Sequence, residues 1–189
     1  MADCGKLKKG QAAPCEPAAA GLKTKLVLVR YDDIASIVAE ATNPKIKKIT
    51  LKSGTKGFLF EGLGESNAGR AKLVEGKYTG SYTHEFDMVA FGVAPEDLST
   101  VEDLAKDRVV AIVADNNGYY RVFGRNAGLK ASKAETDTAN KDTGGAPELT
   151  LSSTSEKGLA DVFGVMDTSG ATPVLDPVAT AAAFTALYS

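Results

Sequence analysis

The longest regular pattern in this 189-residue chain is the alternation of side chains along Tyr78–Val93. Tyr78, Tyr82, His84, Phe86 and Met88 share one parity, and Thr79, Ser81, Thr83, Glu85 and Asp87 share the other. A period of two is typical of a β-strand with one face against a core. At about 3.3 Å per residue the segment would span roughly 50 Å, longer than an ordinary strand. We therefore expect it to bend near Gly80 or Gly92, or to project beyond the body of the fold.

Other segments rich in β-branched and aromatic residues predict further strands. They are Lys25–Tyr31, Lys45–Lys52, Gly57–Glu61, Arg108–Asp115, Tyr119–Gly124 and Glu148–Ser155. Asn116–Gly118 predicts a hairpin turn, because Asn-Gly favours the turn types that join twisted antiparallel strands. Ser53–Lys56 is a second candidate hairpin loop. The segment Ile34–Glu40 is apolar but ambiguous.

One helix is predicted at about residues 95–106. Pro95 suits the first helical position, and the acidic Glu96 and Asp97 favour the positive end of the helix dipole. Val101 and Leu104 belong to an apolar stripe that would cover the open face or end of a sheet.

The chain has 19 glycines and many Thr and Ser residues, as turn-rich β proteins do. We predict a mostly β fold: an antiparallel β-sandwich or barrel with one flanking helix at about 95–106 and extended N- and C-terminal arms. Residues 1–23 form the N-terminal arm in this interpretation, and 24–165 the sandwich domain with a mobile loop at 131–147. Residues 166–189 form the C-terminal arm, whose apolar end would dock on the body or on a neighbouring subunit.

Charge and hydropathy argue against three classes of protein: duplex-DNA-binding, membrane-spanning and secreted proteins. Twenty-two basic and 24 acidic residues give a formal charge of −2, and we find no basic patch suited to gripping duplex phosphates. No run of about 18 apolar residues predicts a membrane span. The N-terminus lacks the apolar stretch of a secretory signal, so we expect the protein to be made and folded in a cytoplasm.

The residue types for catalysis and metal binding are scarce. Cys4 and Cys15 are the only cysteines, and free thiols are favoured over a disulfide for a cytoplasmic protein. His84 is the only histidine, and on a strand it faces away from Glu85 and Asp87. We therefore expect no enzyme activity, no catalytic residues, no metal site and no cofactor.

Three stretches and the order of the elements carry a family resemblance. The stretches are Leu28–Ile34, Ala114–Gly124 followed by Gly128 and Leu129, and Glu148–Gly158. A sandwich, a helix between two long strands, an N-terminal arm and a long loop follow one another as in phage tail tube proteins. The chain resembles that family, and in particular the tube proteins of phages that infect Bacteroides-type bacteria.

The resemblance implies a structural virion protein that self-assembles into hexameric rings, which stack into a tail tube for DNA ejection. Its partners would be further copies of itself, other tail proteins and genomic DNA that passes without specific binding, and no membrane. The protein would be assembled in the bacterial host cytoplasm and reside in the virion tail. Arm 1–23 and loop 131–147 would bridge to the adjacent ring.

Together with the side-chain parity, the resemblance assigns two residue sets. The lumen or inter-subunit face would comprise Thr79, Ser81, Thr83, Glu85, Asp87, Glu148, Thr150, Ser152 and Thr154. Tyr82, Phe86, Leu149 and Leu151 would pack beneath this face. A lumen of small polar and acidic groups would repel phosphate and let DNA slide.

Two alternatives stay open. A capsid-decorating or head-completion protein could share the sandwich and the arms, but it would add to a preformed shell. A non-viral β-sandwich module could bind carbohydrate or protein through loops 62–70 and 131–147, although these loops lack clustered aromatic residues.

Overall fold

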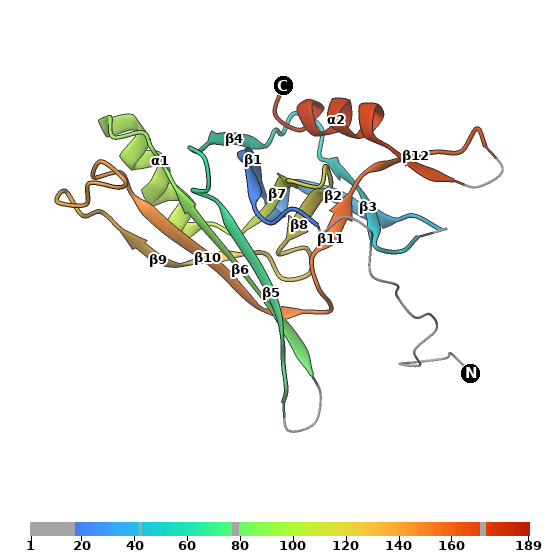
Figure 1. Ribbon diagram of the computed structural model, residues 1–189, viewed down its shortest axis with the longest axis horizontal. Helices are drawn as coiled ribbons and strands as arrows, with labels where there is room; N and C mark the ends of the chain where they lie inside the picture. The colour runs from blue at the N-terminus through green and yellow to red at the C-terminus, as the bar shows by residue number, and fades with distance from the viewer. Residues whose placement is uncertain (1–17, 42, 77–79, 171–172) are drawn as a thin grey trace.

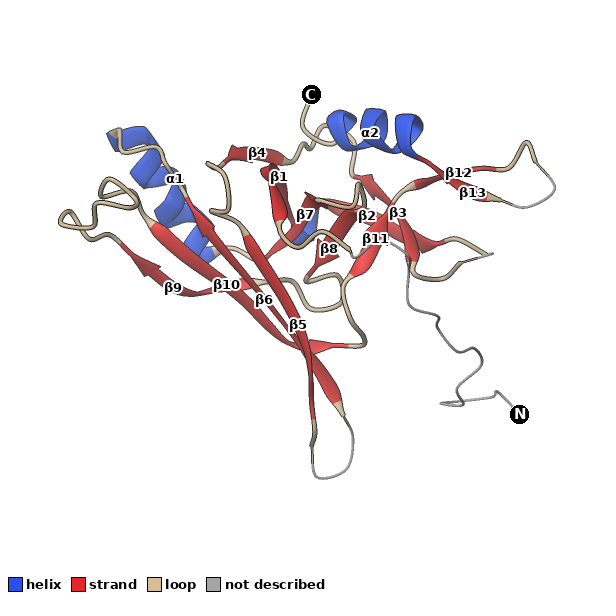
Figure 2. Cartoon of the chain, in the orientation of Figure 1, coloured by secondary structure: helices blue, strands red, loops and turns tan. Residues whose placement is uncertain are grey.

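The computed structural model describes residues 18–41, 43–76, 80–170 and 173–189. Within these residues the chain is mostly β, with two large sheets, one two-stranded sheet and two α-helices (Figures 1 and 2). Four residues for which the sequence analysis makes predictions lie outside the described residues: Cys4, Cys15, Tyr78 and Thr79. Most of the predicted N-terminal arm, residues 1–23, also lies outside them. No helix of the described part is both long and apolar enough to cross a bilayer.

The first sheet has seven strands. Their order is β2 (Ile34–Ala39), β3 (Ile46–Leu51), β11 (Asp161–Phe163), β8 (Tyr120–Phe123), β7 (Val109–Asp115), β1 (Leu22–Arg30) and β4 (Phe58–Glu61). All neighbours are antiparallel except β3 and β11, which run parallel. The Asn-Gly hairpin joins β7 to β8 as predicted.

The second sheet has four strands in the order β5 (Ala68–Val74), β6 (Ser81–Val89), β10 (Glu148–Glu156) and β9 (Lys130–Glu135). Every pair in it is antiparallel. Neither large sheet closes into a barrel over the residues described. The two sheets face each other over a common core, so the sandwich half of the fold prediction is confirmed.

The core lies on both faces of the seven-stranded sheet. Leu26 and Leu28 of β1 enter the cluster between the two sheets, while Val27 and Val29 enter a second cluster on the opposite face. A strand buried on both faces needs apolar residues at every position. This explains why the first strand reads as one continuous apolar run.

The predicted helix is confirmed as α1 (Pro95–Lys106). Val101 and Leu104 are buried in the cluster between the sheets, and α1 packs against β9. The Asp97 carboxylate accepts a hydrogen bond from the Ala94 amide at 3.3 Å, which satisfies one free donor at the helix start.

The predicted single helix and extended C-terminal arm are wrong. Residues 166–189 instead contain most of a hairpin of β12 (Val165–Asp167) and β13 (Val174–Asp176), followed by α2 (Pro177–Ala186). Asp176 caps α2 by accepting hydrogen bonds from the amides of Val178 and Ala179, both at 2.9 Å. Phe184 is buried in the second core cluster, so the apolar tail docks on the body as expected.

Two element boundaries and one strand pairing also differ from the sequence prediction. The 131–147 segment is not a loop throughout, because its first residues belong to β9, which pairs with β10. The long strand is shorter than expected, since β6 spans Ser81–Val89. The Ser53–Lys56 loop does not make a hairpin: β3 pairs with β2 and β11, whereas β4 pairs with β1 at the far edge of the sheet.

Candidate functional site

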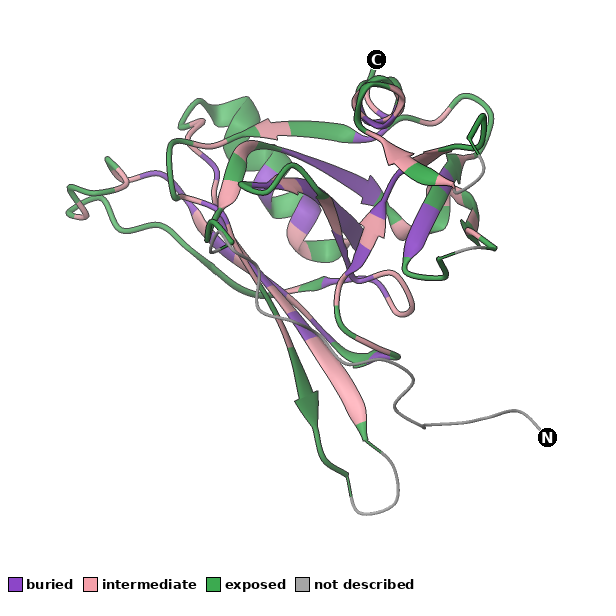
Figure 3. Cartoon of the chain, turned by 45° about the vertical axis from the view of Figure 1, so that its right-hand side comes forward, coloured by how far each residue is buried: buried purple, intermediate pink, exposed green. Residues whose placement is uncertain are grey.

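The outer face of the four-stranded sheet collects most of the residues predicted for the lumen face. Along β6, His84, Phe86 and Met88 are buried, whereas Thr83 and Glu85 are partly exposed on the other side. Figure 3 shows the exposed and half-buried residues of the β5–β6 hairpin where it projects past the sandwich. The predicted parity of this strand is therefore correct.

The register of β10 against β6 brings the two predicted stretches together. Thr150 lies opposite Asp87, and Ser152 lies opposite Glu85. Their inward neighbours Leu149, Leu151 and Phe86 are buried in the cluster between the sheets, as expected of residues packing beneath the face. Tyr82 is different: it is only half-buried and belongs to neither core cluster, so it does not pack beneath the face as predicted.

The remaining predicted face residues lie at the margins of the sheet. Glu148 begins β10 opposite Val89, and Ser81 begins β6 opposite Val74 of β5. Thr154 is exposed beside an irregularity in the β6–β10 register, between Ser153 and Glu156. Thr79 lies outside the described residues.

Basic side chains share this face. Arg70 of β5 pairs with Asp87 and lies 3.5 Å from Glu85, and Lys72 lies 3.9 Å from Glu85. On the other side, Lys133 of β9 pairs with Glu135 and lies 4.0 Å from Glu148. The expected acidic surface is therefore a polar surface of paired charges.

A hydrogen bond ties the two central strands together on the same face: the Thr150 hydroxyl donates to the Asp87 carboxylate at 2.8 Å. The basic residues Arg70, Lys72 and Lys133 were not predicted for this face, because neither β5 nor β9 was predicted as a strand. The alternation of Arg70, Lys72 and Val74 with Gly69, Ala71 and Leu73 is the pattern that could have identified β5.

The edges of this sheet are open. Over the described residues, neither β5 nor β9 has a second strand neighbour. Because the four strands alternate in direction, the two edge strands run opposite to each other. Unpaired edge strands present rows of backbone donors and acceptors that can pair with another chain.

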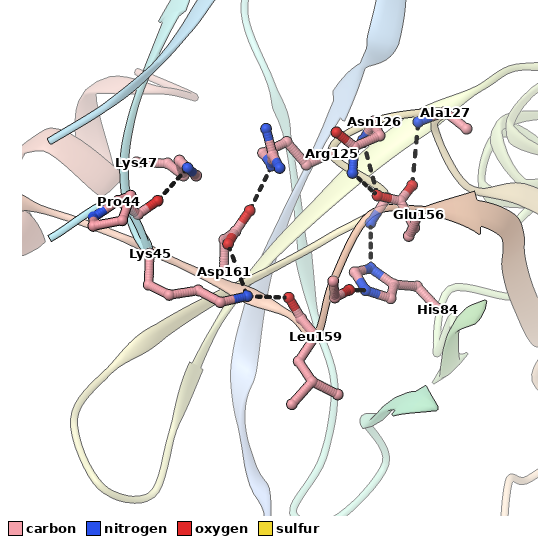
Figure 4. Close-up of polar contacts among 12 residues, drawn as sticks. Pro44, Lys45, Lys47, His84, Arg125, Asn126, Ala127, Glu156, Leu159 and Asp161 are labelled. Carbon is pink, nitrogen blue, oxygen red and sulfur yellow. Dashed lines mark hydrogen bonds and ion pairs between the residues drawn. The ribbon is translucent and has the colours of Figure 1, made fainter. Parts of the chain in front are cut away.

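A second polar region is buried between the sheets and includes His84 (Figure 4). The Gly124 amide donates to His84 Nδ1 at 3.1 Å, so Nε2 carries the proton and donates to the Gly158 carbonyl at 2.8 Å. The ring also meets Phe123 edge-on, with centroids 5.8 Å apart. Both nitrogens thus hold backbone groups, and the imidazole is a neutral structural element.

Glu156 is the centre of this buried region and is 2% exposed. Its carboxylate accepts hydrogen bonds from the Asn126 amide at 2.9 Å and side chain at 2.8 Å, the Ala127 amide at 3.1 Å and the Ser153 hydroxyl at 3.0 Å. Burial alone would raise the pKa of Glu156, but these hydrogen bonds outweigh it and hold the pKa below the usual 4.5. The carboxylate fastens the turn after β8 to the end of β10.

Comparison with known proteins adds no relative: no family model, no curated protein and no solved structure matches this chain. In the buried polar region, His84 and Glu156 have their hydrogen-bonding groups engaged within the chain. The four-stranded sheet, in contrast, has a polar outward face and, over the described residues, two edge strands with one neighbour each.

Proposed function

We propose that this protein is a structural virion subunit, the tail tube protein of a phage, whose copies join edge to edge through the four-stranded sheet. The observation that carries the proposal is the geometry of this sheet: a polar outer face, a packed inner face and two open, oppositely directed edges. The resemblance of the sequence to tail tube proteins supports the same assignment.

The strand directions suit a closed ring. If β9 of one copy lies beside β5 of the next, the antiparallel alternation continues across the boundary, and closure leaves no open edge in this sheet. Six copies, the number that the resemblance implies, would contribute roughly twenty-four strands. At about 4.8 Å per strand and a tilt of about 40°, such a barrel is roughly 48 Å across. Barrels of about 16–18 strands already enclose an aqueous channel.

The polar face of the four-stranded sheet would then line the channel. Its other face is covered by the seven-stranded sheet, which would therefore lie on the outside of the ring. Paired charges and hydroxyls create little net field, so DNA phosphates would find no cluster of unpaired cations to hold them. DNA would pass without specific binding. The proposed partners are further copies, other tail proteins and the passing genome, in a virion tail assembled in the host cytoplasm.

Assembly is tested first by negative-stain microscopy and light scattering at rising concentration. We expect rings or tubes with a central hole. A second test replaces Cys4 and Cys15 with serine and introduces Lys72→Cys on β5 with one cysteine on β9, at Lys130, Lys133 or Glu135 in turn. Within one chain these strands are about 14 Å apart, too far for a disulfide of about 4.4–6.8 Å between Cα atoms.

Oxidation should therefore give a ladder of covalently linked copies for at least one of these pairs. The control pair Lys72→Cys with Lys48→Cys, which places the second cysteine on β3 of the other sheet, should give none. A chain that stays monomeric at high concentration and yields no ladder would contradict self-assembly through these edges. That result would favour a subunit added to a preformed shell, or a binding module.

The charge balance of the face gives a further prediction. The double variant Glu85→Gln with Asp87→Asn should make assembled tubes retain DNA in a salt-sensitive way, because Arg70 and Lys72 lose their partners. Co-sedimentation of DNA with the tubes measures the effect. The control Glu96→Gln with Glu102→Gln changes the net charge equally on exposed positions of α1 and should retain no DNA. Equal retention by both variants would exclude this face as the channel lining.

A further inference from the structure

The buried polar region opens into a pocket with an excess of positive charge. The pocket has a volume of about 200 Å³ and lies where β3, β6, β10 and β11 meet the turn after β8 (Figure 4). Four cationic residues line it: Lys45, Lys47, Arg125 and Lys157. Only two carboxylates do so, in a chain whose formal charge is −2 overall.

Both carboxylates already have partners within the chain. Glu156 is satisfied by amide and hydroxyl donors, as described above. Asp161 is shared by Arg125, whose Nε lies 2.5 Å away, and by Lys45, whose Nζ lies 3.3 Å away. Lys45 also donates to the Leu159 carbonyl at 2.9 Å.

Within the described part of the chain, the positive charge of Lys47 has no carboxylate partner in this arrangement. It is 6% exposed, and its ammonium donates to the Pro44 carbonyl. No carboxylate of the described residues lies within 4.0 Å of it. Burial lowers the pKa of Lys47; the negative charge of Asp161 opposes this, and the positive charges of Arg125 and Lys45 add to it. A buried ammonium among other cations is costly unless an anion accompanies it.

We propose that this pocket binds a small tetrahedral oxyanion of the phosphate or sulfate class, with Lys47 as the buried charge and Arg125 as the planar donor. Charge-assisted hydrogen bonds from an ammonium and a guanidinium suit such an anion, whose oxygens can each accept from a different donor. The bound anion would join β3 to β11 and to the turn after β8, and so brace this end of the seven-stranded sheet. This inference is independent of the assembly proposal.

Inorganic phosphate is the probe. Isothermal titration of the purified full-length chain, in chloride of matched ionic strength, should show saturable binding, and the melting temperature should rise with phosphate. Sulfate should compete. Absence of saturable binding to the natural chain would overturn the proposal without any variant.

The variant Lys47→Met should weaken phosphate binding by at least about tenfold, because it removes a charge-assisted contact. Lys48→Met is the matched control: it alters the neighbouring lysine of β3, which is exposed and points away from the pocket. A general effect of phosphate on stability would be the same for both variants, so a difference in affinity between them reports binding at Lys47. If Lys47→Met does not fold, Lys47→Arg keeps the charge and should retain binding. Equal affinity of Lys47→Met and Lys48→Met would refute the assignment.

Discussion

Replacing Phe86 with alanine should destabilise the folded chain by about 3–5 kcal/mol, measured by urea unfolding at neutral pH. The Phe86 ring is 0% exposed and lies in the cluster between the two sheets, with its centroid 5.6 Å from that of Phe123. Truncation would remove a large apolar contact and leave a cavity that packed strands cannot close. The variant therefore measures how firmly β6 holds its inner face against the body.

The matched control is Phe58→Ala. Phe58 lies on the edge strand β4 and is 51% exposed, so the same truncation should cost less than about 1 kcal/mol. Equal losses from the two variants would mean that Phe86 does not point into the core. The residues assigned to the outer face of β6 would then have to be exchanged with those assigned to its inner face.

Glu156→Gln should also be strongly destabilising, by about 2–4 kcal/mol at neutral pH. The carboxylate accepts hydrogen bonds from two backbone amides, one side-chain amide and one hydroxyl. Glutamine would turn an NH₂ group toward these donors and remove the charge that strengthens them. Glu148→Gln is the control on the same strand: Glu148 is half-buried and accepts one hydrogen bond from Asn140, so its loss should cost less than about 1 kcal/mol. Similar losses from the two variants would contradict the buried role of Glu156.

The pH dependence follows from the lowered pKa of Glu156. A carboxyl whose pKa is lower in the folded chain than in the unfolded chain stabilises the fold above the unfolded value. That contribution is lost as the pH falls from about 4.5 through the folded pKa. Urea unfolding between pH 6 and about 3 should therefore show a steeper loss of stability for the natural chain than for Glu156→Gln. Parallel curves would show that another group controls acid unfolding.

Features that depend only on residues close together in the sequence were predictable from the sequence. The period-two pattern of β6 and β10 identified which residues point outward, because alternation is a property of the strand itself. Pro95 and the apolar stripe predicted α1, and Asn116–Gly118 predicted the β7–β8 hairpin, for equally local reasons. The strand β1 was also predicted from its own apolar residues, and its burial on both faces fits their unbroken run.

Helix α2 has a local signal in the sequence, whereas β9 has none. Asp176 followed by Pro177 is a typical helix start, yet two prolines and an alanine-rich run suggested an extended arm. The strand β9 is exposed almost throughout, so it has little apolar periodicity, and its pairing with β10 rather than its own composition makes it a strand. β5 differs from β9, because the alternation along its sequence is a local strand signal, with Arg70 and Lys72 on the outer face next to β6.

The sequence by itself determined the mostly β class, the helix α1 and the two faces of β6 and β10, because these follow from periodicity within a few residues. Only the tertiary structure decided which strands are neighbours and which charges meet. β3 and β4 are separated by a short loop but lie far apart in the sheet, while Lys45 reaches Asp161 across a long stretch of chain. Such pairings depend on burying both faces of the central sheet at once, which no local pattern specifies.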